Sequence, residues 1–184
     1  MGNGVAEVTG SGNWFAWGNT TTITGDQVKV TGTIGSDKGA TLVLGDGTAE
    51  GEVDLSRYAG LVINGGVTFN NVSKQTIANA INAGGAVTIN GPVEFGGDVT
   101  AAGLTVGAET TFGGDVTVTS GNTAFNAETT VPGTFRNPGK GTVTIGAPTT
   151  FGAVEGSISS YTFNASGRRS DVHSELEGCD ALVL

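Results

Sequence analysis

The sequence predicts an all-β protein, a β-solenoid of about seven coils formed by one chain or by intertwined chains. A seven-residue segment recurs along the 184 residues in imperfect copies. Successive copies begin 21, 19, 26, 17, 19 and 20 residues apart. A period near 20 in a Gly- and Thr-rich chain is typical of a solenoid in which each repeat forms one coil. The strong copies are INGGVTF (63–69), INGPVEF (89–95), VGAETTF (106–112), FNAETTV (125–131) and IGAPTTF (145–151), and fainter ones begin at Ile23 and Leu44.

The strong copies also indicate which side chains point inward. Alternate residues of a strand share one face, and the alternate positions of each copy are large, small, medium and large. Because strands on neighbouring coils lie about 4.8 Å apart, the last position of each copy predicts an internal ladder. A single coil could not bury its own Phe, whereas a stack of coils can. The expected members of the ladder are Phe69, Phe95, Phe112, Val131 and Phe151.

Composition and charge limit the classes of partner. Hydrophobic residues make up 37% of the chain, which is enough for a fold when they alternate regularly. Eight Lys and Arg against 17 Asp and Glu give a net charge of −9, which repels the phosphate backbone of nucleic acid. We expect no membrane insertion, because no apolar run approaches the length of a membrane span and the start MGNGVAEVTG does not resemble a signal peptide. The single cysteine, Cys179, fits synthesis in a cytoplasm.

Residues 1–20 do not follow the repeat and carry both tryptophans of the chain. We expect this segment to form an N-terminal aromatic cap, because the open end of a solenoid needs a cover. The alternative is an aromatic platform for a sugar or a protein. Trp14, Phe15 and Trp17 are therefore candidate partner-contact residues.

Residues 21–160 are expected to form the solenoid repeats, with one helical insertion. The longest spacing between copies, 26 residues, includes the segment 73–85. Ser73 could cap a helix, Ile77 and Ile81 stand one helical turn apart, and Gly84 could end it. The pattern predicts a short helix that covers an apolar corner or serves as a binding epitope.

Residues 161–184 follow the last repeat as a tail, which ends in ALVL. Apolar residues at a chain end need a surface to cover. The tail either caps its own solenoid or clips onto another subunit. Leu182, Val183 and Leu184 are candidate partner-contact residues on the second interpretation.

The repeats contain no evident catalytic set. VGAETT and FGGDVT resemble the left-handed β-helix of hexapeptide acyltransferases, which use a His, but the only His is His173, outside the repeats. TIANAINAGGAVTI (76–89) resembles the entry segment of pectin-lyase-like folds, which implies either polysaccharide chemistry or a surface adhesin. Asp98 and Asp115 occupy equivalent places 17 residues apart, and we interpret them as solvent-exposed carboxylates. We expect no catalytic residue, cofactor or metal site.

Residues 87–120 resemble the Gly/Asp-Val-Thr and Thr-Thr-Phe repeats of phage tail and head fibres. That resemblance implies a non-enzymatic structural protein of a virus particle, either a fibre segment or a capsid-decorating subunit. It would form a homo-oligomer or bind other virion subunits, and it would be made in the host cytoplasm and reside in the virion. The first alternative is a passenger fragment of a bacterial surface adhesin that contacts a cell-surface glycan, and the second is a polysaccharide-active β-helix enzyme.

Overall fold

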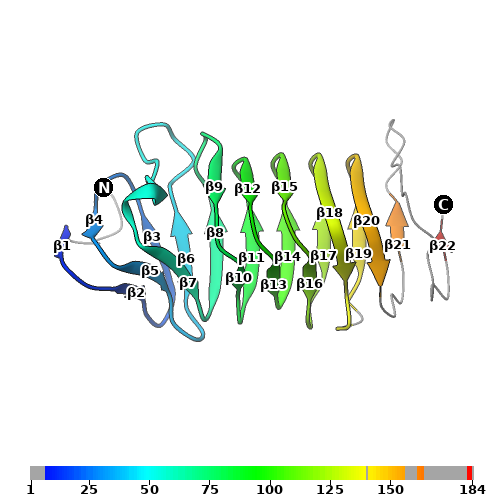
Figure 1. Cartoon of the computed structure of the whole chain (residues 1–184), viewed down its shortest axis with the longest axis horizontal. Coiled ribbons are helices and arrows are strands. Elements are labelled where there is room, and N and C mark those ends of the chain that lie inside the picture. Colours follow the sequence, from blue (N-terminus) through cyan, green and yellow to red (C-terminus); the bar gives the residue numbers. More distant parts are fainter. Residues whose placement is uncertain (1–6, 140, 156–160, 164–181, 184) are drawn as a thin grey trace.

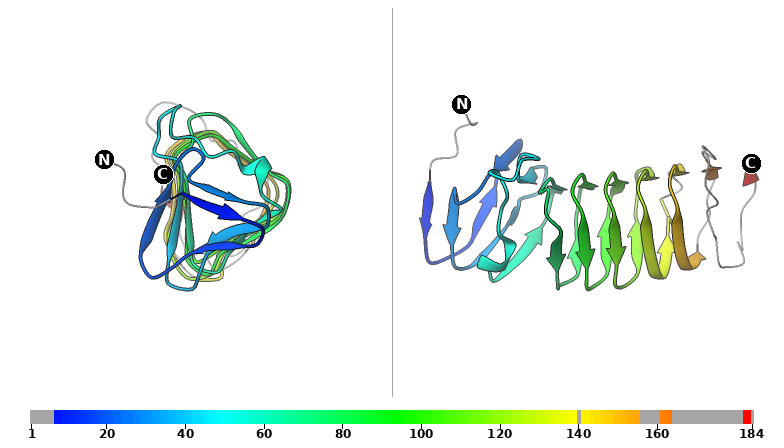
Figure 2. Two further views of the ribbon diagram at one scale, coloured as in Figure 1. Left: turned by 90° about the vertical axis from the view of Figure 1, so that its left-hand side faces the viewer. Right: turned by 90° about the horizontal axis from the view of Figure 1, so that it is seen from above.

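The computed structural model describes residues 7–139, 141–155, 161–163 and 182–183. They form a β-solenoid of about seven turns built from stacked parallel strands, which confirms the all-β fold class. The coils follow one another along a single axis (Figure 1), and seen end-on they enclose one core with three sides (Figure 2, left). We call these sides the first, second and third walls. No helix of the described residues is long and apolar enough to cross a membrane.

The first wall is continuous along the whole stack. Nine strands pair in parallel, and each is two to four residues long. The wall consists of β3 (Thr20–Ile23), β6 (Thr41–Leu44), β8 (Gly66–Phe69), β11 (Ala86–Ile89), β14 (Gly103–Val106), β17 (Thr123–Phe125), β19 (Val143–Ile145), β21 (Tyr161–Phe163) and β22 (Leu182–Val183).

The second and third walls are each interrupted once. The second wall pairs β1 (Val8–Gly10) with β4 (Val28–Val30), and after the interruption it continues through β9 (Gln75–Ile77), β12 (Val93–Phe95), β15 (Thr110–Phe112) and the first parts of β18 (Thr129–Arg136) and β20 (Thr149–Glu155). The third wall pairs β2 (Trp14–Ala16), β5 (Thr33–Ser36) and β7 (Gly60–Ile63), and continues through β10 (Ile81–Asn82), β13 (Val99–Ala101), β16 (Val116–Val118) and the second parts of β18 and β20.

The helical insertion expected at 73–85 is wrong. That segment contains β9 and β10, which belong to two different walls. Ile77 and Ile81 are both buried, and they reach the core from two strands that meet at an exposed corner rather than from one helical face. The neighbouring coil decides this outcome, because Ile77 pairs with Phe95 and Ile81 pairs with Val99. Spacing of four residues fits a strand, a corner and a strand as well as it fits a helical turn.

The extra residues of the solenoid lie at 45–59 instead. Paired residues of the first wall are separated by 25 residues from Leu42 to Val67, against 20 from Val67 to Val87 and 17 from Val87 to Leu104. The longer coil contains the 3-10 helix η1 (Leu55–Arg57) where its second-wall strand would stand. We call residues 45–59 the insertion.

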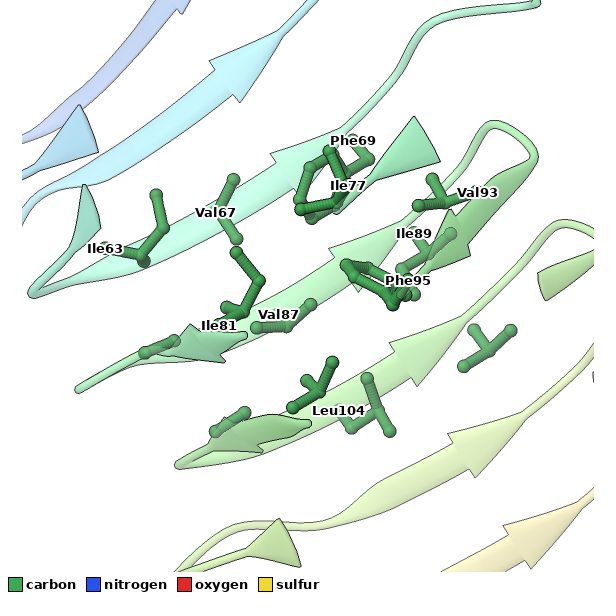
Figure 3. Packing of buried hydrophobic residues seen from close by; sticks show 14 of the residues in the cluster. Ile63, Val67, Phe69, Ile77, Ile81, Val87, Ile89, Val93, Phe95 and Leu104 are labelled. Carbon is green, nitrogen blue, oxygen red and sulfur yellow. The ribbon is translucent and has the colours of Figure 1, made fainter. Parts of the chain in front are cut away.

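The inward side chains form the core, but Phe69 does not lie on the same wall as Phe95 and Phe112, as the expected ladder requires. Each seven-residue copy turns a corner, since β11 ends at Ile89 and β12 begins at Val93. Phe95 pairs with Phe112, and their rings stack 5.2 Å apart at 8°. Phe69 belongs to the first wall, where it pairs with Ile89, and its ring meets that of Phe95 edge-on from the other side of the corner at 5.5 Å (Figure 3).

Three buried threonines satisfy their hydrogen bonds locally. The three threonines each lie two residues after an alanine at a corner, and they are at most 2% exposed. Each hydroxyl donates to a carbonyl two residues earlier, at 2.8 to 3.0 Å. A buried hydroxyl without such a partner would destabilise the fold, so these bonds allow Thr to take inward positions. The threonines are Thr110, Thr129 and Thr149, which bond to Ala108, Ala127 and Ala147.

The two ends of the chain also take part in the stack. The expectation that residues 1–20 stand outside the repeat is wrong for 8–16, because β1 pairs with β4 and β2 pairs with β5. The repeat also continues beyond residue 160, since β21 pairs with β19. Short strands of three residues carry too little sequence pattern to mark these coils. The rest of the tail, 164–181 and Leu184, lies outside the described residues.

Replacement of Phe112 by Ala should cost about 3 to 5 kcal/mol of unfolding free energy, because it opens a cavity in the ring stack. The measurement is the denaturant midpoint with its slope. Thr130→Ala is the matched control, since Thr130 is exposed on the following coil and should change stability by less than about 1 kcal/mol. Equal losses in both variants would contradict the inward register.

Candidate functional site

The predicted aromatic contact residues separate into two roles. Trp14 is partly buried and packs against the core, on the strand position that pairs with Ile34. Phe15 is partly buried. Because it is the next residue of the strand after Trp14, its side chain points to the opposite face of the sheet. Trp17 follows the strand at a corner and is 77% exposed. Of the three, Trp17 is the side chain most available to a partner.

β22, which carries Leu182 and Val183, lies at the opposite end of the stack from β2, which carries Trp14 and Phe15 (Figure 1). Leu182 and Val183 form β22, which pairs with Tyr161 and Thr162 of the same chain. Leu184 lies outside the described residues. The structure does not bring the two predicted groups together, and contact with another subunit stays a prediction for both.

A cleft that was not predicted lies beside the insertion. Its volume is about 440 Å³. We call it the insertion cleft. Its inner part is apolar, because the buried side chains of Ile34, Ile77 and Ile81 line it. The remaining lining residues are 54–56 and 58–61 on the side of the insertion, and 74–76, Ala78 and Asn79 on the side of the next coil.

The cleft exists because three ladders end there. β7 is the last strand of one sheet, and β9 and β10 are the last strands of another. On the second wall no strand stands between β4 and β9, because η1 takes that place. A 3-10 helix of three residues cannot continue a β-ladder, so the wall opens where a strand is missing.

Specific hydrogen bonds fix the insertion in place. Asn71, 3% exposed, accepts from the Val53 N–H at 3.0 Å and donates to the Val53 carbonyl at 2.8 Å. Asp54 caps η1 by accepting from the Ser56 N–H. The Tyr58 hydroxyl donates to the Val28 carbonyl at 2.7 Å, and burial raises the pKa of Tyr58. These contacts fix the position of the insertion beside the cleft.

The charged groups at the cleft are paired. Lys74 Nζ lies 2.8 Å from Glu94 Oε2, and the hydrogen bond to Glu94 raises the pKa of Lys74. Arg57 pairs with Asp54 at 3.3 Å and also contacts Asp26. The groups that remain for a ligand are neutral hydrogen-bonding side chains, backbone edges and apolar surface. This arrangement suits binding.

Asp98 and Asp115, which occupy equivalent places in the sequence, lie on neighbouring coils at a corner and are joined by a hydrogen bond. Asp98 Oδ1 accepts from the Asp115 N–H at 2.9 Å, and Asp115 Oδ1 accepts from the Thr134 N–H at 2.8 Å. Arg136 joins Asp115 at 2.6 Å and Glu155 at 2.9 Å. The Thr134 N–H and then Arg136 lower the pKa of Asp115. Sequence reasoning missed Arg136 because it lies 21 residues beyond Asp115, one coil along.

Asp115→Asn should therefore lower the thermal midpoint, whereas Asp98→Asn should leave it nearly unchanged, because only Asp115 has a cationic partner among the described residues. The decrease in the thermal midpoint caused by Asp115→Asn should be present at pH values above 3.8, the ordinary pKa of an Asp carboxyl. It should shrink as the pH falls from 3.8 through the lowered pKa of Asp115, where protonation removes the ion pair in the parent chain as well. Equal behaviour of the two variants across that pH range would contradict this assignment.

Trp14→Ala should lower the denaturation midpoint, because it removes packing from the first described coil. Trp17→Ala should change the free energy of unfolding by no more than about 0.5 kcal/mol, as expected for an exposed side chain. Chemical denaturation followed by circular dichroism measures both. The reverse order of effects would show that the assignment of the two side chains to core and surface is wrong.

Comparison of the chain with protein-family models, with curated proteins and with solved structures found no match. We therefore infer a function from the fold and from the insertion cleft.

Proposed function

We propose that the protein is a non-enzymatic structural component of a virus particle, either a fibre segment or a capsid-decorating subunit. The observation that carries the proposal is the unbroken first wall, which runs through nine paired strands from β3 to β22. A stack in which each coil contacts only its neighbours forms a stiff, extended element. The likeness of residues 87–120 to phage fibre repeats supports the viral setting.

The outer face of the first wall supports assembly with further subunits. Its central row carries short side chains on successive coils. Short side chains let two such walls approach closely, as a homo-oligomer or a contact with other virion subunits requires. The row consists of Thr68, Thr88, Thr105, Ala124 and Thr144.

A passenger fragment of a bacterial surface adhesin is the second candidate, and the insertion cleft favours it. Gln75, Thr76 and Asn79 offer neutral hydrogen-bonding groups beside apolar surface, which a cell-surface glycan could use. A polysaccharide-active enzyme receives less support, because Asp98 and Asp115 already bond to neighbouring coils. Bonds of this kind give the two carboxylates a structural role.

Deletion of residues 168–184 tests the proposal. The truncated chain should keep its β-type circular dichroism spectrum and lose the oligomeric mass that light scattering measures for the full chain. Most of this segment lies outside the described residues, and only β22 is placed. Leu182→Ser with Val183→Ser is the matched control, because it keeps the length of the tail and removes its apolar side chains. Unfolding of the truncated chain as a monomer would identify the tail as a cap on its own solenoid.

A further inference from the structure

An Asn-Gly pair stands at the corner between the third and first walls. β7 ends at Ile63 and β8 begins at Gly66, so Asn64 and Gly65 form this corner. It borders a second cleft of about 250 Å³, which we call the corner cleft and which is lined by residues 38–41, 64–66 and 84–86. Asn64 is exposed, and the cleft that Gly65 lines is large enough to admit water.

An Asn-Gly pair has a chemistry that needs no enzyme. The deprotonated backbone nitrogen of the Gly attacks the side-chain carbonyl carbon of the Asn, and the missing Cβ atom of Gly leaves room for this approach. A bond forms between this nitrogen and Cγ, the bond between Cγ and Nδ2 breaks, and the side-chain nitrogen leaves as ammonia. Water then opens the cyclic imide at either of its carbonyls, which yields aspartate or isoaspartate. Water is the only co-reactant.

The backbone nitrogen of Gly65 is weakly held. Its N–H donates to the Ser36 hydroxyl at 3.3 Å, which is longer than a usual N–H···O hydrogen bond. A hydrogen-bonded N–H must be released before solvent can remove its proton, so a long bond lowers the barrier to the attack. Gly66 follows Gly65, and therefore no side chain restricts the backbone on that side of the corner.

A second Asn-Gly pair, Asn90 and Gly91, serves as an internal comparison. It lies at the corner between β11 and β12. The N–H groups of both residues donate to the Phe69 carbonyl, at 2.8 and 3.1 Å. Pro92 follows and restricts the backbone of Gly91, and the pocket that Gly91 lines has no room for water. The same chemistry should therefore be slower at this corner.

We propose that Asn64–Gly65 is a site of spontaneous deamidation in the folded protein and that the fold protects Asn90–Gly91. The site does not depend on the proposed virion role. Either product adds a carboxylate to the corner cleft and one negative charge to a chain of net charge −9. Lys38 lines the same cleft and makes no ion pair with another described residue, so the new carboxylate has a cation nearby. Isoaspartate also lengthens the main chain at the corner.

Peptide mapping of the aged full chain tests the proposal. The chain is incubated in mildly alkaline buffer and digested at low pH, and mass spectrometry follows the peptides that contain Asn64 and Asn90. Asn64 should convert at least tenfold faster, a difference that corresponds to about 1.4 kcal/mol in the barrier. In the chain unfolded by urea the two rates should become similar, because neither corner exists there. Asn3–Gly4, which lies outside the described residues, is followed in its own peptide.

Asn64→Gln is the matched variant, because a longer side chain must close a larger ring and reacts more slowly. The exposed position should accept Gln without loss of the fold. Labelling by isoaspartyl methyltransferase should detect much less isoaspartate in aged Asn64→Gln than in the parent chain, whereas Asn90→Gln should match the parent.

The comparison of the two corners within the parent chain stands whether or not either variant folds. Conversion of Asn90 at a rate equal to or above that of Asn64 in the folded chain would overturn the proposal. Conversion of Asn64 in urea without conversion in the folded chain would overturn it as well, because the corner would then protect the pair.

Discussion

The structure depends on the lateral register between neighbouring coils. No coil can bury its inward side chains alone, because Phe95 is covered by Phe112 from the next coil and by Phe69 across the corner. The same register places polar residues in contact along the stack. Gly114 leaves room for the Asp98 carboxylate, where a Cβ atom would collide with it, and Asp98 can then accept from the N–H of the coil that follows. Ring packing in the core and hydrogen bonding at the corner therefore require the same register between neighbouring coils.

A coil that departs from this register has a local consequence rather than a global one. The insertion lengthens one coil, yet the first wall stays paired through Leu42, Val67 and Val87. The ladder on the second wall is lost at that coil, and the insertion cleft results. Because solenoid stability is carried by nearest-neighbour contacts, the chain can keep open strand edges in the second and third walls while the continuous first wall holds the stack together. A rigid scaffold and a binding cleft are therefore compatible in this fold.

The amino-acid pattern was sufficient for the fold class and for the inward side chains of the later coils, since Phe95, Phe112 and Phe151 recur with the alternation that buried strands require. It was insufficient where two coils align only in three dimensions. Ile63 and Ile89 begin similar segments, but Ile63 pairs with Ser36 on the third wall, whereas Ile89 belongs to the first. That misalignment moved the expected insertion from 45–59 to 73–85 and hid the cleft. A cleft made by a missing strand leaves no motif, only a longer interval between paired residues.

A double-mutant cycle on Phe95 and Phe112 measures the register most directly. With Phe95→Leu, Phe112→Leu and the double variant, the unfolding free energies should show a coupling of about 0.5 to 1.5 kcal/mol, as expected for stacked rings. The pair Phe95 and Phe151 is the control, because three rungs of about 4.8 Å separate these residues along the stack and their effects should add within about 0.5 kcal/mol. Additive effects for Phe95 and Phe112, or equal coupling in both pairs, would contradict the register on which this account depends.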